Sequence, residues 1–203
     1  ANVATANKYI TAITLLDGSG ANAGLASNYA LPTLNYANAP VTITPATLGL
    51  SASKIYNATT DLTGAISISG LVGNQSLTYT GATANDANVA SANKYINAMT
   101  LGNGSNGGLA SNYALPTLNS TNAPVSITPA TLGLSASKRY DGTTDLTGAV
   151  SISGLVGNQT LTYTDATASD ANVATANKYI AAITLGNGSN GGLASNYALP
   201  TLN

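Results

Sequence analysis

The 203 residues carry little charge: charged residues make up 6% of the chain, and its formal net charge is −1. This balance gives no basic surface, so neither nucleic acid nor an anionic membrane is expected as a partner. Cysteine and histidine are absent, which excludes disulfides, thiol nucleophiles and imidazole or thiolate metal ligands. The chain contains no run of 18 apolar residues, so no segment is predicted to insert into a membrane.

The chain repeats itself at a spacing of 84 residues. Residues 43–119 align with residues 127–203, and only ten of these 77 aligned pairs differ. A period of this length exceeds that of solenoid repeats, which is about 20–50 residues, so each unit is predicted to be a domain of its own. We expect the C-terminal half of a module at 1–42, a complete module at 43–126, and a module lacking its final strand at 127–203.

Taken in chain order, the predicted elements are short strands separated by turns. The first is 41–44, where Val and Ile alternate with Thr between two prolines, and similar alternation follows at 65–69 and 77–80. A segment rich in Gly and Asn at 102–108 predicts a turn. Apolar residues on one face and hydroxyl groups on the other are typical of half-buried antiparallel strands. The pattern favours an all-β fold of tandem, small, antiparallel β-sandwich-like (Ig-like) modules.

One run allows a different fold. Residues 82–98 are rich in Ala, and a short helix there would give an α+β, β-grasp-like module instead. The Asn, Thr, Ser and Asp residues scattered through the run favour turns over a helix interior.

Four short motifs in the third unit stand in a fixed order. They are Ile-Thr-Pro-Ala at 127–130, Lys-Arg-Tyr-Asp-Gly-Thr-Thr at 138–144, Gly-Leu-Val-Gly-Asn at 154–158 and Ser-Asn-Tyr at 195–197. In these motifs the chain resembles the YDG repeat of filamentous-haemagglutinin-like bacterial surface adhesins and, more distantly, the related MBG repeats. The resemblance implies β-rich stalk modules of large secreted proteins, with no catalytic residues.

The second unit departs from the motif that names the YDG repeat, because it has Tyr56-Asn57-Ala58 in place of Tyr-Asp-Gly. This substitution indicates that the motif is a preference for a turn rather than a metal site.

Tyrosine gives the clearest pattern of single residues. Because Phe and Trp are absent, the amphipathic tyrosine ring is predicted to be the large core residue, with its hydroxyl at the surface or on a backbone partner. An alternative is a stacking platform for glycans. Ten tyrosines recur at equivalent positions of the copies: Tyr9, Tyr95, Tyr179, Tyr29, Tyr113, Tyr197, Tyr56, Tyr140, Tyr79 and Tyr163.

The acidic residues are too few to suggest an enzyme. General acid–base catalysis needs carboxyl groups that converge in a cleft, and the sequence offers no such pair, so we expect no catalytic site and no cofactor. Calcium is the one alternative, because it binds oxygen ligands. The candidate calcium ligands are Asp141, Asp145, Asp165 and Asp170.

Lysines recur beside abundant Asn, as they would in a Lys–Asn isopeptide crosslink. The crosslink candidates are Lys54, Lys138, Lys94 and Lys178. The alternative is that these lysines are solvated charges that protect strand edges from unwanted pairing.

The repeats and the lack of a catalytic constellation predict a structural function, and the resemblance to YDG repeats implies that it is at the bacterial cell surface. The first hypothesis is a secreted stalk or spacer, whose partners are neighbouring modules or other copies of the chain. The second is an extracellular fibre joined by β-strand addition between modules. The third is a module that binds glycans directly, with an unknown receptor.

Overall fold

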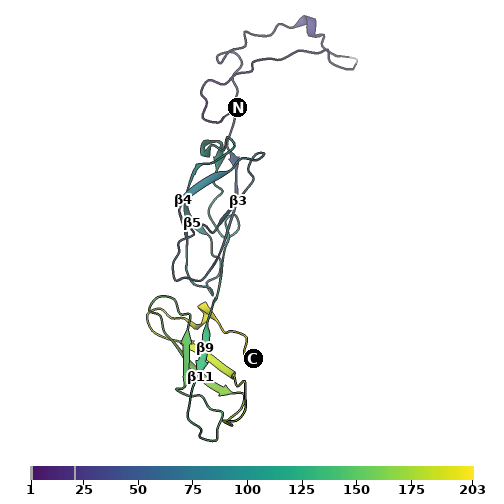
Figure 1. Cartoon of the computed structure of the whole chain (residues 1–203). Coiled ribbons are helices and arrows are strands. Elements are labelled where there is room, and N and C mark those ends of the chain that lie inside the picture. The colour runs from purple at the N-terminus through teal and green to yellow at the C-terminus, as the bar shows by residue number, and fades with distance from the viewer. Residues whose placement is uncertain (1, 21) are drawn as a thin grey trace. The chain divides into compact units, whose positions relative to one another are not determined.

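The computed structural model describes residues 2–20 and 22–203, and nearly all of its regular structure is β-strand (Figure 1). The helical segments in these ranges are three single 3₁₀ turns: Ala26–Asn28, Ala110–Asn112 and Ala194–Asn196. The all-β class predicted from the sequence is therefore confirmed. A search of the same ranges finds no helix with the length and apolar character needed to span a bilayer.

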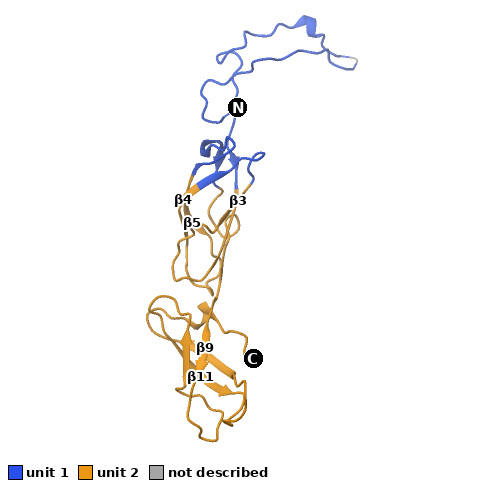
Figure 2. Cartoon of the chain, viewed as in Figure 1, with its two compact units in different colours: residues 1–48, 70–78, 102–115 blue, residues 49–69, 79–101, 116–203 orange. Residues whose placement is uncertain are grey.

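Two compact units make up the chain, and neither is one consecutive stretch of sequence (Figure 2). Unit 1 contains residues 1–48, 70–78 and 102–115, and unit 2 contains residues 49–69, 79–101 and 116–203. The predicted division into three consecutive domains follows the sequence repeat instead, and it stays a prediction.

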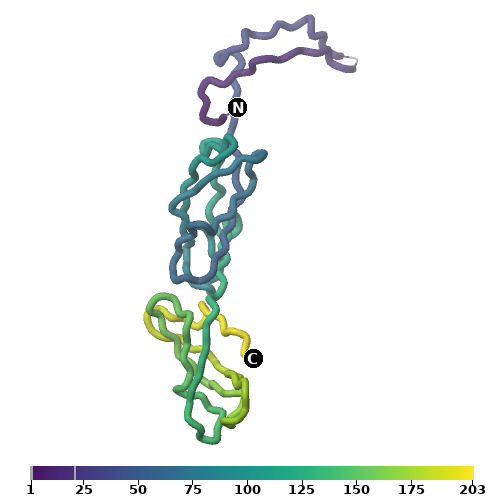
Figure 3. Tube along the Cα trace, in the orientation of Figure 1, coloured from purple at the N-terminus to yellow at the C-terminus, as the bar shows by residue number. Residues whose placement is uncertain are grey.

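Unit 1 has little regular structure in its first segment. The described residues of 2–44 contain one 3₁₀ turn and no strand, so the strand predicted at 41–44 is not formed. Figure 3 traces the path of this segment in purple. Backbone hydrogen bonds still join the two ends of this segment, because Ile10 N–H donates to the Ala39 carbonyl oxygen at 3.0 Å. Strand β1 (Ala46–Thr47) then pairs in parallel with β6 (Tyr113–Ala114).

Unit 2 contains a three-stranded sheet with β2 (Gly49–Ile55) in its middle. On one side β2 pairs antiparallel with β3 (Ile66–Ser69). On the other side it pairs in parallel with β7 (Val125–Thr128), so that Ala52 lies opposite Val125. The strand that completes this sheet therefore comes from far along the sequence, where the third copy of the repeat begins.

Most of the other strands also recur at the repeat spacing. Strands β4 (Leu77–Ala84) and β5 (Ile96–Asn103) form a two-stranded sheet, and β11 (Leu161–Ala168) pairs antiparallel with β12 (Ile180–Asn187) at the equivalent positions. The remaining pairs are β9 (Gly133–Ala136) with β10 (Val150–Ser153), antiparallel, and β8 (Ala130–Thr131) with β13 (Tyr197–Ala198), parallel. The parallel pairs show that the expectation of purely antiparallel pairing is wrong in part, because alternation along a strand does not reveal the direction of its neighbour.

The core is aliphatic. Leu62 and Ile96 are completely buried, and a cluster in the third copy joins Leu146, Ile180 and Ile183. Burying one such side chain stabilises a fold by about 1.5–3 kcal/mol. This core is supplied by strand residues such as Ile96, Ile180 and Ile183, together with Leu62 and Leu146 from the connections between strands.

No helix forms in residues 82–98, so the β-grasp-like alternative is wrong. Strand β4 continues to Ala84, β5 begins at Ile96, and bends and turns connect them. Within this connection the Asp86 carboxylate accepts a hydrogen bond from Asn88 N–H at 2.6 Å. Such local bonds from a side chain to the backbone compete with helix formation.

Candidate functional site

Two of the acidic residues named as calcium candidates, Asp141 and Asp145, each accept hydrogen bonds within a local turn. Asp145 accepts hydrogen bonds from Thr147 N–H at 2.9 Å and from the Thr147 hydroxyl at 2.7 Å, and these bonds lower the pKa of its carboxyl group. Asp141 accepts the same pair of bonds from Thr143. An ion pair with Lys138 at 2.7 Å contributes most to lowering the pKa of Asp141 to about 2.

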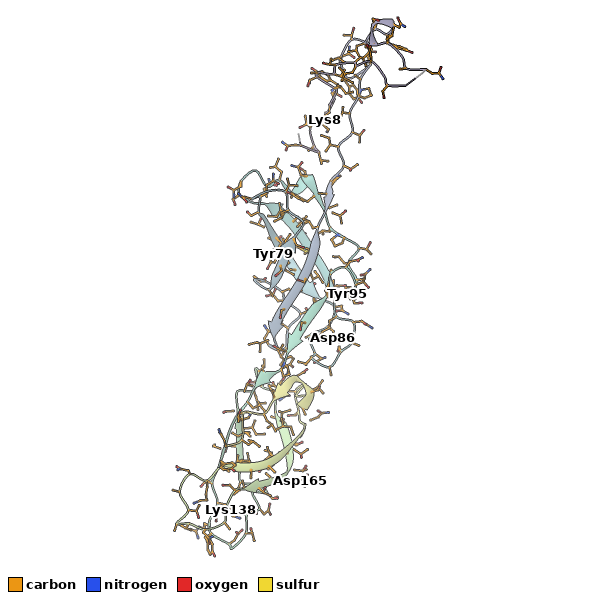
Figure 4. All side chains as sticks on the ribbon, turned by 90° about the vertical axis from the view of Figure 1, so that its right-hand side faces the viewer. Lys8, Tyr79, Asp86, Tyr95, Lys138 and Asp165 are labelled. Atoms are coloured by element: carbon orange, nitrogen blue, oxygen red, sulfur yellow. The ribbon has the colours of Figure 1, made fainter. Side chains whose placement is uncertain are left out.

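The other two calcium candidates lie elsewhere in unit 2. Asp165 occupies a bulge in β11 with a φ of 55° (Figure 4), whereas Asp170 accepts a bond from Asn172 N–H that lowers the pKa of its carboxyl group. The described residues bring no three acidic side chains together at one place. Calcium binding stays a prediction that rests on the sequence alone.

The ammonium group of each of the four crosslink candidates donates hydrogen bonds to backbone carbonyl oxygens of a nearby loop. The Lys54 ammonium donates to the Thr59 and Asp61 carbonyl oxygens at 2.7 and 2.9 Å, and Lys138 repeats this arrangement with Thr143 and Asp145. Burial lowers the pKa of Lys54. The other two, Lys94 and Lys178, bond to carbonyl groups of the loop just before them.

None of the hydrogen bonds found for these four ammonium groups in the described ranges ends on an Asn side chain. The crosslink therefore stays a prediction, and an intact mass below the sequence mass by one ammonia per bond would reveal it.

The ten recurring tyrosines differ strongly in burial. Tyr79 and Tyr163 are half-buried, and their hydroxyl groups accept bonds from Ile66 N–H and Val150 N–H. Among the others, Tyr56, Tyr113 and Tyr197 are buried, Tyr95 is half-buried, and Tyr9, Tyr29, Tyr140 and Tyr179 are exposed. Equivalent residues of near-identical copies therefore have different surroundings.

One buried tyrosine links two copies of the sequence repeat. The ring of Tyr56 meets Tyr197 edge-to-face, with 5.5 Å between the ring centroids. Gln159 Nε2 donates to the Tyr56 hydroxyl at 2.9 Å, and Gln159 Oε1 accepts a bond from the Tyr197 hydroxyl. These three residues, the tyrosine junction, join the second copy to the third within unit 2.

An asparagine makes a second link between the same copies. Asn196 is completely buried; its Oδ1 accepts a bond from Val89 N–H and its Nδ2 donates to Asn88 Oδ1, both at 2.8 Å. In unit 1, Asn112 bonds in the same way to Val3 N–H at 2.7 Å and to Asn2 Oδ1 at 3.1 Å. We call this arrangement the asparagine clasp.

Our reading of the sequence identified neither link. A signal was present, because Asn-Val recurs at 2–3, 88–89 and 172–173, and Ser-Asn-Tyr recurs at 27–29, 111–113 and 195–197. Ser-Asn-Tyr at 195–197 was recognised as a motif, but Asn is so common in this chain that nothing in the sequence connected Asn196 with Asn88 and Val89.

The third link is strand β7 itself, because its apolar side chains fill the edge of the sheet beside β2. Val125 and Ile127 are buried there, and Ala52 and Tyr56 are only 5% and 4% exposed. The backbone joins as well: Ala52 N–H donates to the Pro124 carbonyl oxygen at 3.0 Å, and Tyr56 N–H donates to that of Thr128 at 2.8 Å.

At the equivalent place beside β9 there is an open groove of about 630 Å³. Its lining includes Leu134, Ala136, Tyr140 and Ile180. Tyr140, the counterpart of Tyr56, is 63% exposed, and Ala136, the counterpart of Ala52, is also exposed. We call this cavity the β9 groove.

Comparison with known proteins gives one match. A family model described as the YDG domain matches residues 121–203, a range that begins just before β7 and runs through β13. No match was found among the curated proteins or among the solved structures. Residues 121–203 of this chain are a YDG domain.

Proposed function

We propose that the chain is a structural segment of a secreted bacterial surface protein, in which successive copies of the repeat join to form a stalk or spacer. The observation that carries the proposal is β7. This strand, Val125–Thr128, spans the boundary between the second copy (43–126) and the third (127–203), and it completes the sheet of the second copy at β2.

The tyrosine junction and the asparagine clasp support the same function. Both are formed by side chains that recur at the repeat spacing, and both connect the second copy to the third. Aromatic pairs and satisfied buried amides limit motion between the elements that they join. Links of this kind, repeated at each step, suit an array that keeps its parts in register.

The low charge and the near-identity of the copies also favour a mechanical role. A specialised ligand site in one copy would make that copy differ from the others, and a site in every copy would need the same cleft in each. The glycan-binding alternative has less support. It needs an exposed aromatic platform shared by the copies, whereas Tyr140 is exposed and its counterpart Tyr56 is buried.

The spacer function can be tested on a bacterial surface. The chain would be placed between a membrane anchor and a reporter epitope, in versions with one or two additional 84-residue copies inserted after residue 126. We expect binding of a large antibody to the epitope to rise with each added copy. Binding that does not depend on copy number, or adhesion of host cells by the chain itself, would contradict the spacer function.

A further inference from the structure

The β9 groove lies along an edge of β9 that no strand covers in the described residues. On its other edge β9 pairs with β10, so that Ala136 lies opposite Val150. In the second copy the corresponding edge of β2 is covered by β7. An open strand edge with apolar residues beside it is a template for addition of another strand.

A segment of the right sequence is present elsewhere in the chain. Residues 40–45 read Pro-Val-Thr-Ile-Thr-Pro, and residues 124–129, which contain β7, read Pro-Val-Ser-Ile-Thr-Pro. Although Val125 and Ile127 are buried, their counterparts Val41 and Ile43 are only half-buried, and 41–44 belongs to no strand. Unit 1 thus offers a strand that has no sheet.

We propose that residues 41–44 of one copy of the chain add as a parallel strand to residues 136–139 of a second copy, which begin at the last residue of β9 and continue beyond it. This inference rests on the proposed function, because it extends the joint between repeats to a joint between molecules. The register follows from the β2–β7 pair: Val41 lies opposite Ala136, and Ile43 lies opposite Lys138. Val41 and Ile43 then fill the β9 groove as Val125 and Ile127 fill its counterpart.

The backbone groups at the entrance to the groove match the incoming strand. In the second copy, Lys94 accepts a bond from Val125 N–H, and Ile96 N–H donates to the Ala123 carbonyl oxygen. Lys178 and Ile180 hold the equivalent positions beside the β9 groove.

Residues 39–41 already make the same two bonds within unit 1, to Lys8 and Ile10. On transfer to the second molecule, the segment exchanges these bonds for identical ones and adds a ladder to residues 136–139, at the end of β9 and beyond it. The new ladder and the buried apolar area are therefore a net gain for the assembled state.

The proposal also gives the exposed Tyr140 a partner. Tyr56, its counterpart, packs on a tyrosine and bonds to a glutamine. Unit 1 contains the equivalent pair, since the Tyr113 hydroxyl donates to Gln75 Oε1 at 2.5 Å. The molecule that supplies 41–44 therefore also presents Tyr113 and Gln75 to Tyr140. Because donor and acceptor surfaces differ, the contact is head-to-tail and leads to an open chain of molecules.

Engineered disulfides test the strand and its register, because the natural chain has no cysteine. Chains carrying Val41→Cys and chains carrying Ala136→Cys are mixed under mild oxidation, and the linked dimer is measured on a non-reducing gel. The control pairs Ala136→Cys with Thr42→Cys, one residue out of register. We expect at least about ten times more dimer from the matched pair. Successive side chains of a strand point to opposite faces, and a disulfide cannot join Cβ atoms that point apart. Equal yields, or no dimer, would overturn the proposal.

A peptide of residues 37–45 tests the groove itself. At saturation it should raise the melting temperature of the natural chain by about 5 °C and slow nitration of Tyr140. The same peptide with Val41→Asp and Ile43→Asp should do neither, because both carboxylates would lose hydration beside the apolar part of the lining, at Leu134, Ala136 and Ile180. If the natural peptide has no effect, or both peptides act equally, strand addition is excluded.

The two proposals can fail separately. No crosslink and no peptide binding, together with epitope exposure that still rises with copy number, would remove the joint between molecules and leave the spacer. Crosslinking without any effect of copy number on epitope exposure would remove the spacer function and leave the joint between molecules.

Discussion

At the scale of residues, near-identical side chains in different copies allow comparison within one molecule. Asn196 and Asn28 occupy equivalent positions in Ser-Asn-Tyr turns, yet Asn196 is buried in the asparagine clasp and Asn28 is exposed. The difference comes from the partner, because Asn88 and Val89 cover Asn196.

Asn196→Ala should therefore destabilise the chain. The change leaves Val89 N–H and Asn88 Oδ1 without their partner, which costs about 1–3 kcal/mol for groups removed from water. Asn28→Ala is the matched control and should cost less than about 0.5 kcal/mol. Urea unfolding of both variants measures the difference, and equal losses would show that the clasp contributes nothing.

The Asp-Gly of the third copy and the Asn-Ala of the second form the same turn. Asp141 and Asn57 each accept bonds from the N–H and the hydroxyl of the threonine two residues on. Gly142 and Ala58 both have positive φ, 78° and 62°. The hypothesis that the motif is a preference for a turn agrees with this geometry.

Asp141 adds a charge that Asn57 lacks, and this predicts a dependence on pH. Its pKa is about 2 in the folded chain and 3.8 ordinarily. A lowered pKa in the folded state stabilises the chain above the ordinary value, and the contribution is lost as pH falls from about 4 to 2.

Asp141→Asn should therefore be less stable than the natural chain at pH 7, with a difference that shrinks as pH falls through this window. Because the group is exposed, added salt should reduce the difference. Chemical unfolding at pH 7, 4 and 2 tests this, and a difference that does not change with pH would refute it.

At the scale of elements, alternation predicted strands well where a partner was close in sequence. The patterns at 65–69 and 77–80 correspond to β3 and β4. The same pattern at 41–44 forms no strand, although its counterpart 125–128 is β7. A strand needs a neighbour for its backbone bonds, and only Val125–Thr128 has β2 beside it.

Alternation did not predict β2 or the parallel pairs, whose partners are distant in sequence. The residues of β2, Gly-Leu-Ser-Ala-Ser-Lys-Ile, include only two large apolar side chains. Leu50 is buried, whereas Ile55 is 65% exposed although it lies opposite Thr128 of β7. The counterpart of β2, β9, ends three residues earlier relative to the repeat, at Ala136. Pairings between segments so distant in sequence leave no local pattern, so sequence analysis could not predict them.

Two glycines in different turns allow a prediction about packing: Gly192, just before the last 3₁₀ segment, and Gly142, in the Asp-Gly turn. A Cβ on Gly192 would overlap the backbone carbonyl of Thr160, which cannot move without disturbing β11. Gly192→Ala should therefore cost about 2–3 kcal/mol. Gly142→Ala meets no atom and copies Ala58, so it should cost about 1 kcal/mol or less. Thermal unfolding that ranks the two variants in the opposite order would contradict the packing described for this turn.

At the scale of the whole molecule, our central claim is that the strand at the boundary between two copies completes the sheet of the earlier copy. The claim explains why equivalent residues differ: Tyr56 and Ala52 are covered by β7, whereas Tyr140 and Ala136 face the β9 groove. The sequence repeat alone would predict identical surroundings.

Hydrogen exchange of backbone amides, followed residue by residue by NMR, tests this claim most directly. Ala52 and Tyr56 donate to β7 and its flank, and should exchange slowly, while Ala136 and Tyr140 should exchange rapidly. Ser53 and Ser137 are internal controls, since each donates to its own copy, at Ala65 and Ala149. Both should be protected alike. Equal exchange rates for Ala52 and Ala136, and for Tyr56 and Tyr140, would contradict the account.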